Sequence, residues 1–132
     1  MANTLKYGLF CLLLVTGINT AVQAQDKTRI LIVLDASWSM NNQWQGGIKW
    51  DIAKTTLKRI ADSVSLYPDV EMGLRIFGHQ YPEPDKNCRD SRLEVRIDSN
   101  NLKAIYRKLD EVKPKGITPL VYSLEKCLQD FG

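Results

Sequence analysis

One short stretch of the sequence places an acid and two hydroxyls at every second position after an apolar run. Residues 30–34 are all apolar, and Asp35, Ser37 and Ser39 follow them. If the chain stays extended, these three side chains point the same way, because strand side chains alternate with a period of two. One carboxylate with neutral oxygens suits Mg²⁺, Mn²⁺ or Ca²⁺ and does not suit zinc. Thr118 adds a hydroxyl from a later loop at the same sheet edge, so the sequence predicts a hard-cation site.

A divalent cation held by these ligands would keep a net positive charge. One carboxylate cancels half of the charge of a divalent ion, and hydroxyl ligands cancel none of it. The ion therefore retains an open position for an outside anion, such as an Asp or Glu side chain of a protein partner. No general base is evident beside these residues, so we expect binding and not catalysis.

Hydrophobic periodicity predicts the elements that must position these side chains. A strand hydrophobic on both faces precedes Asp35, and a second strand with alternating apolar residues is expected later in the chain. The expected elements are a strand at 28–35, a helix at 48–66, strands at 70–77 and 93–97, a helix from 100 or 101 to 112, and a helix from 118 onward.

The last helix carries its own start signals and an apolar stripe. Thr118 is expected as its N-cap and Pro119 as its first residue. Its core stripe is predicted to be Leu120, Leu124, Cys127, Leu128 and Phe131.

The order of these elements predicts an α/β fold. We expect a Rossmann-like, doubly wound sheet, mostly parallel, with the third strand as an antiparallel edge strand. The last helix is followed by no strand, although such a helix usually feeds the next parallel strand. The expected sheet therefore lacks its C-terminal strands.

Two motifs give the chain a family resemblance. "LDASWSM" (34–40) resembles the D-x-S-x-S metal loop of the von Willebrand factor type A (vWA) domain, and "KGITPL" (115–120) resembles the threonine loop of that family. The resemblance implies a metal-ion-dependent adhesion site (MIDAS) that captures an acidic residue of a protein partner. It also implies direct metal contacts for Ser37 and Ser39, a direct or water-mediated contact for Thr118, and a contact mostly through water for Asp35.

The sequence departs from the family pattern at two points. Trp38 stands where glycine is common in the family. The last metal-site aspartate of the family, in a T-D-G or S-D-G turn after the next strand, has no counterpart in this sequence. The resemblance therefore implies a partial vWA domain over 25–132, a fragment of a longer protein or a truncated gene model.

The N-terminal segment predicts export. Lys6 precedes the apolar run "YGLFCLLLVTG", and Val22 and Ala24 are small residues at the positions a signal peptidase reads. The run is shorter than the roughly 20 apolar residues of a membrane span. We therefore expect a signal peptide over 1–24, no membrane insertion after cleavage, and a periplasmic, cell-surface or secreted product.

The net charge of the chain bears on the class of partner that it binds, and the cysteines and the single histidine are further candidate functional residues. Without Lys6, 17 Lys and Arg face 15 Asp and Glu, a balance that favours neither nucleic acid nor an anionic membrane as partner. Cys88 and Cys127 are either a disulfide or two free thiols. His79 is expected at the surface. The oligomeric state is left open by the sequence.

Two other function classes compete with the binding module. In a metal-free scaffold domain, the serines would only cap loops. An enzyme of phosphoryl transfer would want a second carboxylate where Ser37 stands, and a serine hydrolase would want G-x-S-x-G, so we rank the enzyme last.

Overall fold

The computed structural model describes residues 27–132. The predicted signal peptide, 1–24, lies outside the described residues. The strands are β1 (Thr28–Asp35), β2 (Gln43–Trp44), β3 (Gly47–Ile48), β4 (Val70–Phe77) and β5 (Ser91–Asp98). The helices are α2 (Lys49–Val64), α3 (Leu102–Glu111) and α4 (Leu120–Asp130), with short 3₁₀ helices η1 (Trp38–Asn41) and η2 (Glu83–Asp85).

The main sheet has three strands in the order β1-β4-β5. β1 and β4 run parallel in unbroken register from Thr28↔Val70 to Asp35↔Phe77, and the crossover between them contains α2. β5 follows β4 without a helix and pairs with it in the antiparallel sense. Among the described residues, β1 is therefore paired along one side only. β2 and β3 form a separate antiparallel ribbon before α2.

The predicted fold class is wrong for this structure. The described chain forms a small α/β fold with a mixed three-stranded sheet and a two-stranded ribbon, and not a doubly wound, Rossmann-like vWA sheet. Only one of the two strand pairings in the sheet is parallel. The physical reason is that, within residues 27–132, only β1 and β4 are joined by a helical crossover, whereas β5 follows β4 without a helix.

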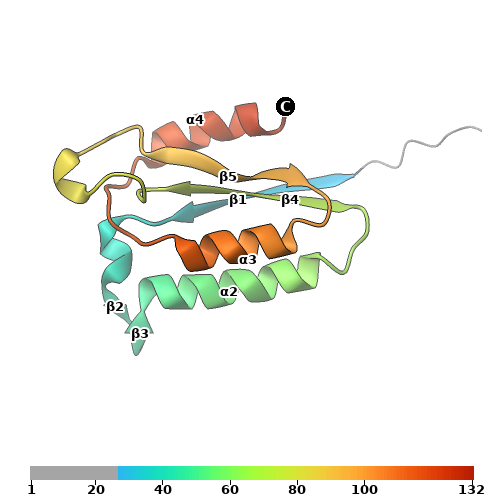
Figure 1. The fold of residues 1–132 in the computed structure, drawn as a ribbon, viewed down its shortest axis with the longest axis horizontal. Coiled ribbons are helices and arrows are strands. Elements are labelled where there is room, and N and C mark those ends of the chain that lie inside the picture. Colours follow the sequence, from blue (N-terminus) through green and yellow to red (C-terminus); the bar gives the residue numbers. More distant parts are fainter. Residues whose placement is uncertain (1–26) are drawn as a thin grey trace, which may run out of the picture.

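Helices cover the two faces of the sheet unequally (Figure 1). α2 and α3 lie side by side on one face, and α4 lies on the other, over β5. The alternate residues Met72, Leu74 and Ile76 of β4 pack toward α2 and α3. The buried core between these layers is Ala36, Trp50, Leu57, Ala61, Met72, Leu74, Ile76, Val95, Ile105 and Leu109.

The predicted core stripe of α4 is wrong, because the helix is rotated. The only buried residue of α4 is Ser123, while Leu124 and Leu128 are 52% and 83% exposed. Arg75 of β4 points to this face of the sheet and forms a two-point ion pair with Asp130, at 2.6 and 2.7 Å. Bringing Asp130 inward turns the leucines of the helix to solvent.

Candidate functional site

The acid and the two serines do meet at the end of β1. The Ser37 N–H donates to Asp35 Oδ1 at 2.7 Å, and the hydroxyl oxygens of Ser37 and Ser39 lie 3.2 Å apart. Ser37 is 2% exposed, whereas Ser39 is exposed. Asp35 Oδ2 has no side-chain hydrogen bond within residues 27–132. The structure thus brings three of the four predicted site residues together.

They meet for a different reason from the one predicted. Ser37 is extended, with φ −68° and ψ 163°, but a 3₁₀ turn begins at Trp38. Ser39 therefore lies on a helical turn and not on a continuing strand. The turn folds the chain back so that the Ser39 hydroxyl reaches the Ser37 hydroxyl, and it leaves Trp38 59% exposed between them.

The fourth predicted residue, Thr118, lies on the neighbouring loop. Ser37 and Gly116 form a parallel β-bridge, and the Trp38 N–H donates to the Gly116 carbonyl at 2.7 Å. Thr118 follows two residues later and is exposed. Thr118 thus shares their edge of the sheet without a hydrogen bond to either serine in the described part of the chain.

The predicted N-cap role of Thr118 is wrong. α4 begins at Leu120 with Pro119 in the cap position, and no side chain caps the helix. Pro119 has ψ 59°, so it is not in helical geometry and the helix starts one residue later than expected. The Thr118 hydroxyl is left without a capping bond.

Two glycines allow the three loops at this edge to approach each other. Gly78 has φ +74°, and a Cβ there would lie 2.8 Å from the Ser37 nitrogen and 2.5 Å from the Ile117 oxygen. A Cβ on Gly116 would lie 2.6 Å from the Tyr81 oxygen. The Gly116 N–H donates to the Gly78 carbonyl at 2.8 Å. The β1, β4 and α4 loops are therefore held together by their backbones.

The serine oxygens have the spacing of neighbouring ligands. The two hydroxyls are within hydrogen-bond distance of each other at 3.2 Å, slightly longer than the usual O–H···O range of about 2.5–3.0 Å. Two oxygens at right angles around Mg²⁺ would be separated by about 3.0 Å, and around Ca²⁺ by about 3.4 Å, from their usual ion–oxygen distances. The spacing of the two serine oxygens is therefore compatible with neighbouring ligands of a hard cation.

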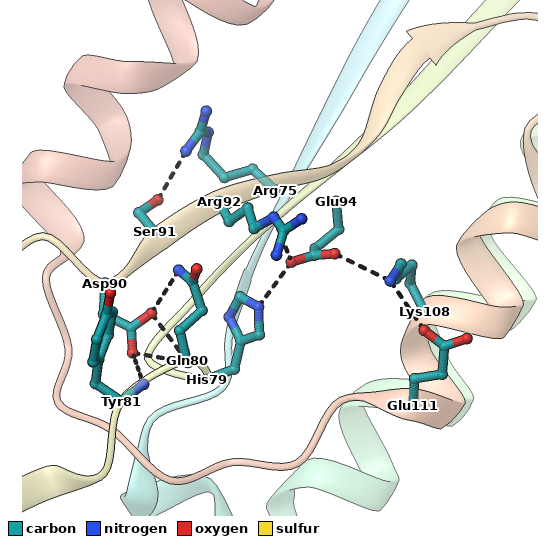
Figure 2. A network of polar contacts seen from close by, with 10 residues as sticks. All are labelled: Arg75, His79, Gln80, Tyr81, Asp90, Ser91, Arg92, Glu94, Lys108 and Glu111. Atoms are coloured by element: carbon teal, nitrogen blue, oxygen red, sulfur yellow. Dashed lines mark hydrogen bonds and ion pairs between the residues drawn. The ribbon is translucent and has the colours of Figure 1, made fainter.

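A buried polar network lies on another part of the same end of the molecule (Figure 2). His79 Nε2 lies 2.9 Å from Glu94 Oε1, and both side chains are at least nine-tenths buried. The expectation that His79 is a surface residue is wrong. The sequence showed Glu94 only as an alternating polar position on a strand, and nothing in the pattern indicated that its side chain turns toward His79 and α3.

The charges around Glu94 set its pKa. Burial alone would raise the pKa of Glu94, but the hydrogen bond with His79 and the nearby His79, Arg92 and Lys108 side chains lower it from its ordinary value. These groups line a pocket of about 400 Å³ between β5 and α3. Within residues 27–132, the His79 Nδ1 atom is buried without a hydrogen-bond partner.

Cys88 and Cys127 are free thiols in this structure. Burial raises the pKa of the Cys127 thiol, against the opposing charge of Arg75. No helix within 27–132 is both long and apolar enough to span a membrane.

Comparisons with known proteins give relatives of similar sequence and fold. The chain is 28% identical over 137 residues to the uncharacterized protein YwmD of Bacillus subtilis (strain 168), covering 99% of this chain and 60% of that protein. It is 25% identical over 116 residues to YwmC of the same organism, covering 85% and 50%. The chain therefore spans 60% and 50% of the length of these curated relatives. No family model matches the chain.

A solved structure with a similar fold is the PilB minor pilin from Streptococcus sanguinis. The TM-score is 0.66 at 14% sequence identity, and the match covers 83% of this chain and 27% of that one. At this identity the likeness concerns the fold alone. The described chain therefore has a fold found in part of a minor pilin.

These findings overturn the predicted vWA domain and its MIDAS. The proteins that match include two uncharacterized Bacillus subtilis proteins and a minor pilin, and the sheet is not the doubly wound sheet that the resemblance required. Residues 27–132 also contain no cluster of three or more His, Cys, Asp or Glu side chains able to hold a metal. The loop after β1 still places one carboxylate beside two hydroxyl groups.

Proposed function

We propose that the chain is a protein-interaction module that acts outside the cytoplasm, with the loop edge of its sheet as the contact surface. A divalent cation, Mg²⁺ or else Mn²⁺ or Ca²⁺, binds at Asp35, Ser37 and Ser39, and Thr118 completes the set from the next loop. The ion then offers a coordination position to an Asp or Glu of the partner protein.

A single observation carries this proposal. The Ser37 and Ser39 oxygens lie 3.2 Å apart beside Asp35, a spacing that suits adjacent ligands of a hard cation. Because the set includes only one carboxylate, a bound divalent ion would keep net positive charge and would attract an anion.

The surroundings of the loop support a contact surface. Trp38, between the two serines, is 59% exposed, and Trp44 on the β2–β3 ribbon is 52% exposed. Tryptophan is enriched among the residues that dominate binding energy in protein interfaces. A partner that reaches the ion with a carboxylate would cover these rings.

The location and the type of activity are part of the same proposal. The apolar N-terminal segment with small residues at 22 and 24 supports an exported protein, on the cell surface, in the periplasm or secreted. The role proposed is binding, including adhesion, and not catalysis. Turnover of a generic phosphate ester that is lost in Asp35→Ala would contradict this part.

Melting curves of the full chain test for the ion. With a Kd of about 1 mM, 10 mM Mg²⁺ would stabilise the fold by about 1.4 kcal/mol and raise the melting temperature by about 6 °C. Asp35→Ala and Ser37→Ala should abolish the rise. Asp98→Ala is the matched control, because Asp98 also accepts a nearby backbone N–H at 2.7 Å but lies at the opposite end of the sheet.

The result separates the two binding hypotheses. If neither Mg²⁺ nor Mn²⁺ nor Ca²⁺ shifts the melting temperature of the unaltered chain, the metal-free scaffold is the better account. If the ion binds, water-proton relaxation with Mn²⁺ tests for its open position. A short glutamate peptide should then displace bound water and lower the relaxation rate.

A further inference from the structure

Asp90 is a buried acid that the proposed cation site does not include. It lies directly before β5 and is 1% exposed. Its two oxygens accept the Gln80 N–H at 3.2 and 3.1 Å, the Gln80 side-chain amide at 3.0 Å and the Tyr81 N–H at 3.2 Å (Figure 2). All of these partners are donors, as an ionised carboxylate requires.

The charge of Asp90 has no cationic partner. None of the ion pairs within residues 27–132 includes it. Its hydrogen-bond partners are neutral amides, which stabilise the charge without cancelling it. Burying an unpaired carboxylate is costly, so such residues are usually paired with a cation or bound to a metal.

Asp90 lies behind the loop that touches Ser37. Its Oδ2 is 2.8 Å from the position that a Cβ on Gly116 would occupy. Gly116 in turn forms the parallel β-bridge with Ser37. The backbones of two segments paired in this way are about 4.8 Å apart. The carboxylate of Asp90 is therefore on the order of 10 Å from the backbone of Ser37.

We propose that Asp90 is the second negative charge of the cation site, a positioning residue that acts on the bound ion through space and not as a ligand. This inference rests on the proposed function. Asp35 alone leaves a bound divalent ion with a net positive charge. Asp90 lowers the free energy of the bound ion by electrostatic attraction, without occupying a coordination position. The ion keeps an open position for its partner while gaining affinity.

The charge effect has a predictable size and form. At a separation of about 10 Å, and with an effective dielectric between those of protein and water, the attraction changes the affinity for a divalent ion by about tenfold. The logarithm of that factor is proportional to the charge of the ion. A trivalent ion should therefore be affected by about thirtyfold, whereas a loop that is merely displaced would weaken both ions by the same factor.

The test measures Mg²⁺ and Tb³⁺ affinity of the full chain by Tb³⁺ luminescence, sensitised by Trp38, with Mg²⁺ as the competitor. Asp90→Asn keeps the shape of the side chain and removes its charge. We expect it to weaken Mg²⁺ about tenfold and Tb³⁺ about thirtyfold. Asp98→Asn, which removes an exposed carboxylate at the far end of the sheet, should change neither affinity by more than about twofold.

A second variant covers the case in which Asp90→Asn does not fold. Gln80→Lys places an ammonium where the Gln80 amide now meets Asp90, so the carboxylate stays in place but its charge is cancelled. It should reproduce the loss of Mg²⁺ affinity. Unchanged affinity in the folded variant, or equal weakening of both ions, overturns the role of Asp90. Absence of binding to the unaltered chain instead overturns the proposed function.

Discussion

The two faces of the sheet are covered by helices that are held in place by different kinds of contact. On the α2 and α3 face, apolar side chains such as Leu74 and Ile105 are fully buried. On the α4 face, Arg75 forms a buried ion pair with Asp130 and also donates to the Ser91 hydroxyl at 3.0 Å. The comparison indicates that α2 and α3 are held by distributed burial, and α4 by a small number of polar contacts.

The difference affects how each face would respond to damage. Apolar burial is spread over many contacts, so the loss of one side chain weakens the whole packed layer. An ion pair fails all at once when either partner is removed, because the remaining charge is left without compensation. α4 lies at the end of the described chain, however, so it can move away and let water reach the exposed charge.

The largest expected effect is on the apolar face. Leu74→Ala removes a side chain with 0% exposure from the middle of the core, and we expect it to lower the free energy of unfolding by about 3 kcal/mol. Urea denaturation followed by circular dichroism measures this loss. A loss below about 1 kcal/mol would mean that the two faces do not differ in the way described.

The next largest effect is expected from the ion pair on the α4 face. Asp130→Ala leaves Arg75 unpaired, and we expect a loss of about 2 kcal/mol, less than the 3–5 kcal/mol typical of a broken buried pair. The loss should be local, with faster amide exchange in α4 and little change in α2. The double variant Arg75→Met, Asp130→Leu should recover most of the stability. Equal loss of protection in α2 and α4 would contradict the separation of the two faces.

A smaller effect is expected from the network around Glu94. The pKa of Glu94 is lowered from its ordinary value in the folded chain, so the ionised carboxylate stabilises the fold near neutral pH, and this contribution is lost as the pH falls through the folded pKa. Glu94→Gln should cost about 1 kcal/mol at pH 7, and the cost should shrink as the pH is lowered from 7 to 3. Denaturation at the two pH values measures the difference. A cost that does not change with pH would assign the effect to packing.

The smallest effect is expected on the outer side of α4. Leu128 is 83% exposed, so Leu128→Ser should change the free energy of unfolding by less than about 0.5 kcal/mol. It should instead raise solubility by reducing the exposed apolar surface. A loss above about 1 kcal/mol, by thermal melting, would show that Leu128 is buried as the sequence had suggested.

The sequence predicted the elements far better than their assembly. The strands at 28–35 and 70–77 match β1 and β4, and the helix expected at 48–66 is α2 at Lys49–Val64. Each has a clear period of two or of 3.6, or an unbroken apolar run. The β2–β3 ribbon was missed, because strands of two residues carry no period.

The orientation of α4 was beyond reach because it depends on a residue far away in the chain. Its leucine stripe alone predicts a buried face, yet Arg75 on β4 selects the side that carries Asp130. The candidate site is similar. The meeting of Ser37 and Ser39 was foreseen, but the 3₁₀ turn that brings it about was not. Asp90 could not be related to the site, because its position depends on how three separate loops pack.

The one-sided pairing of β1 should be visible in the hydrogen-exchange rates of its backbone amides. In a parallel strand, successive residues direct their N–H groups to opposite sides, so within residues 27–132 every second amide of β1 faces β4 and the amides between them do not. Deuterium uptake along β1 should therefore alternate between slow and fast residues, whereas β4, which has neighbours on both sides, should be slow throughout. Uniformly slow exchange along β1 would reveal a further segment of chain bound along its open edge.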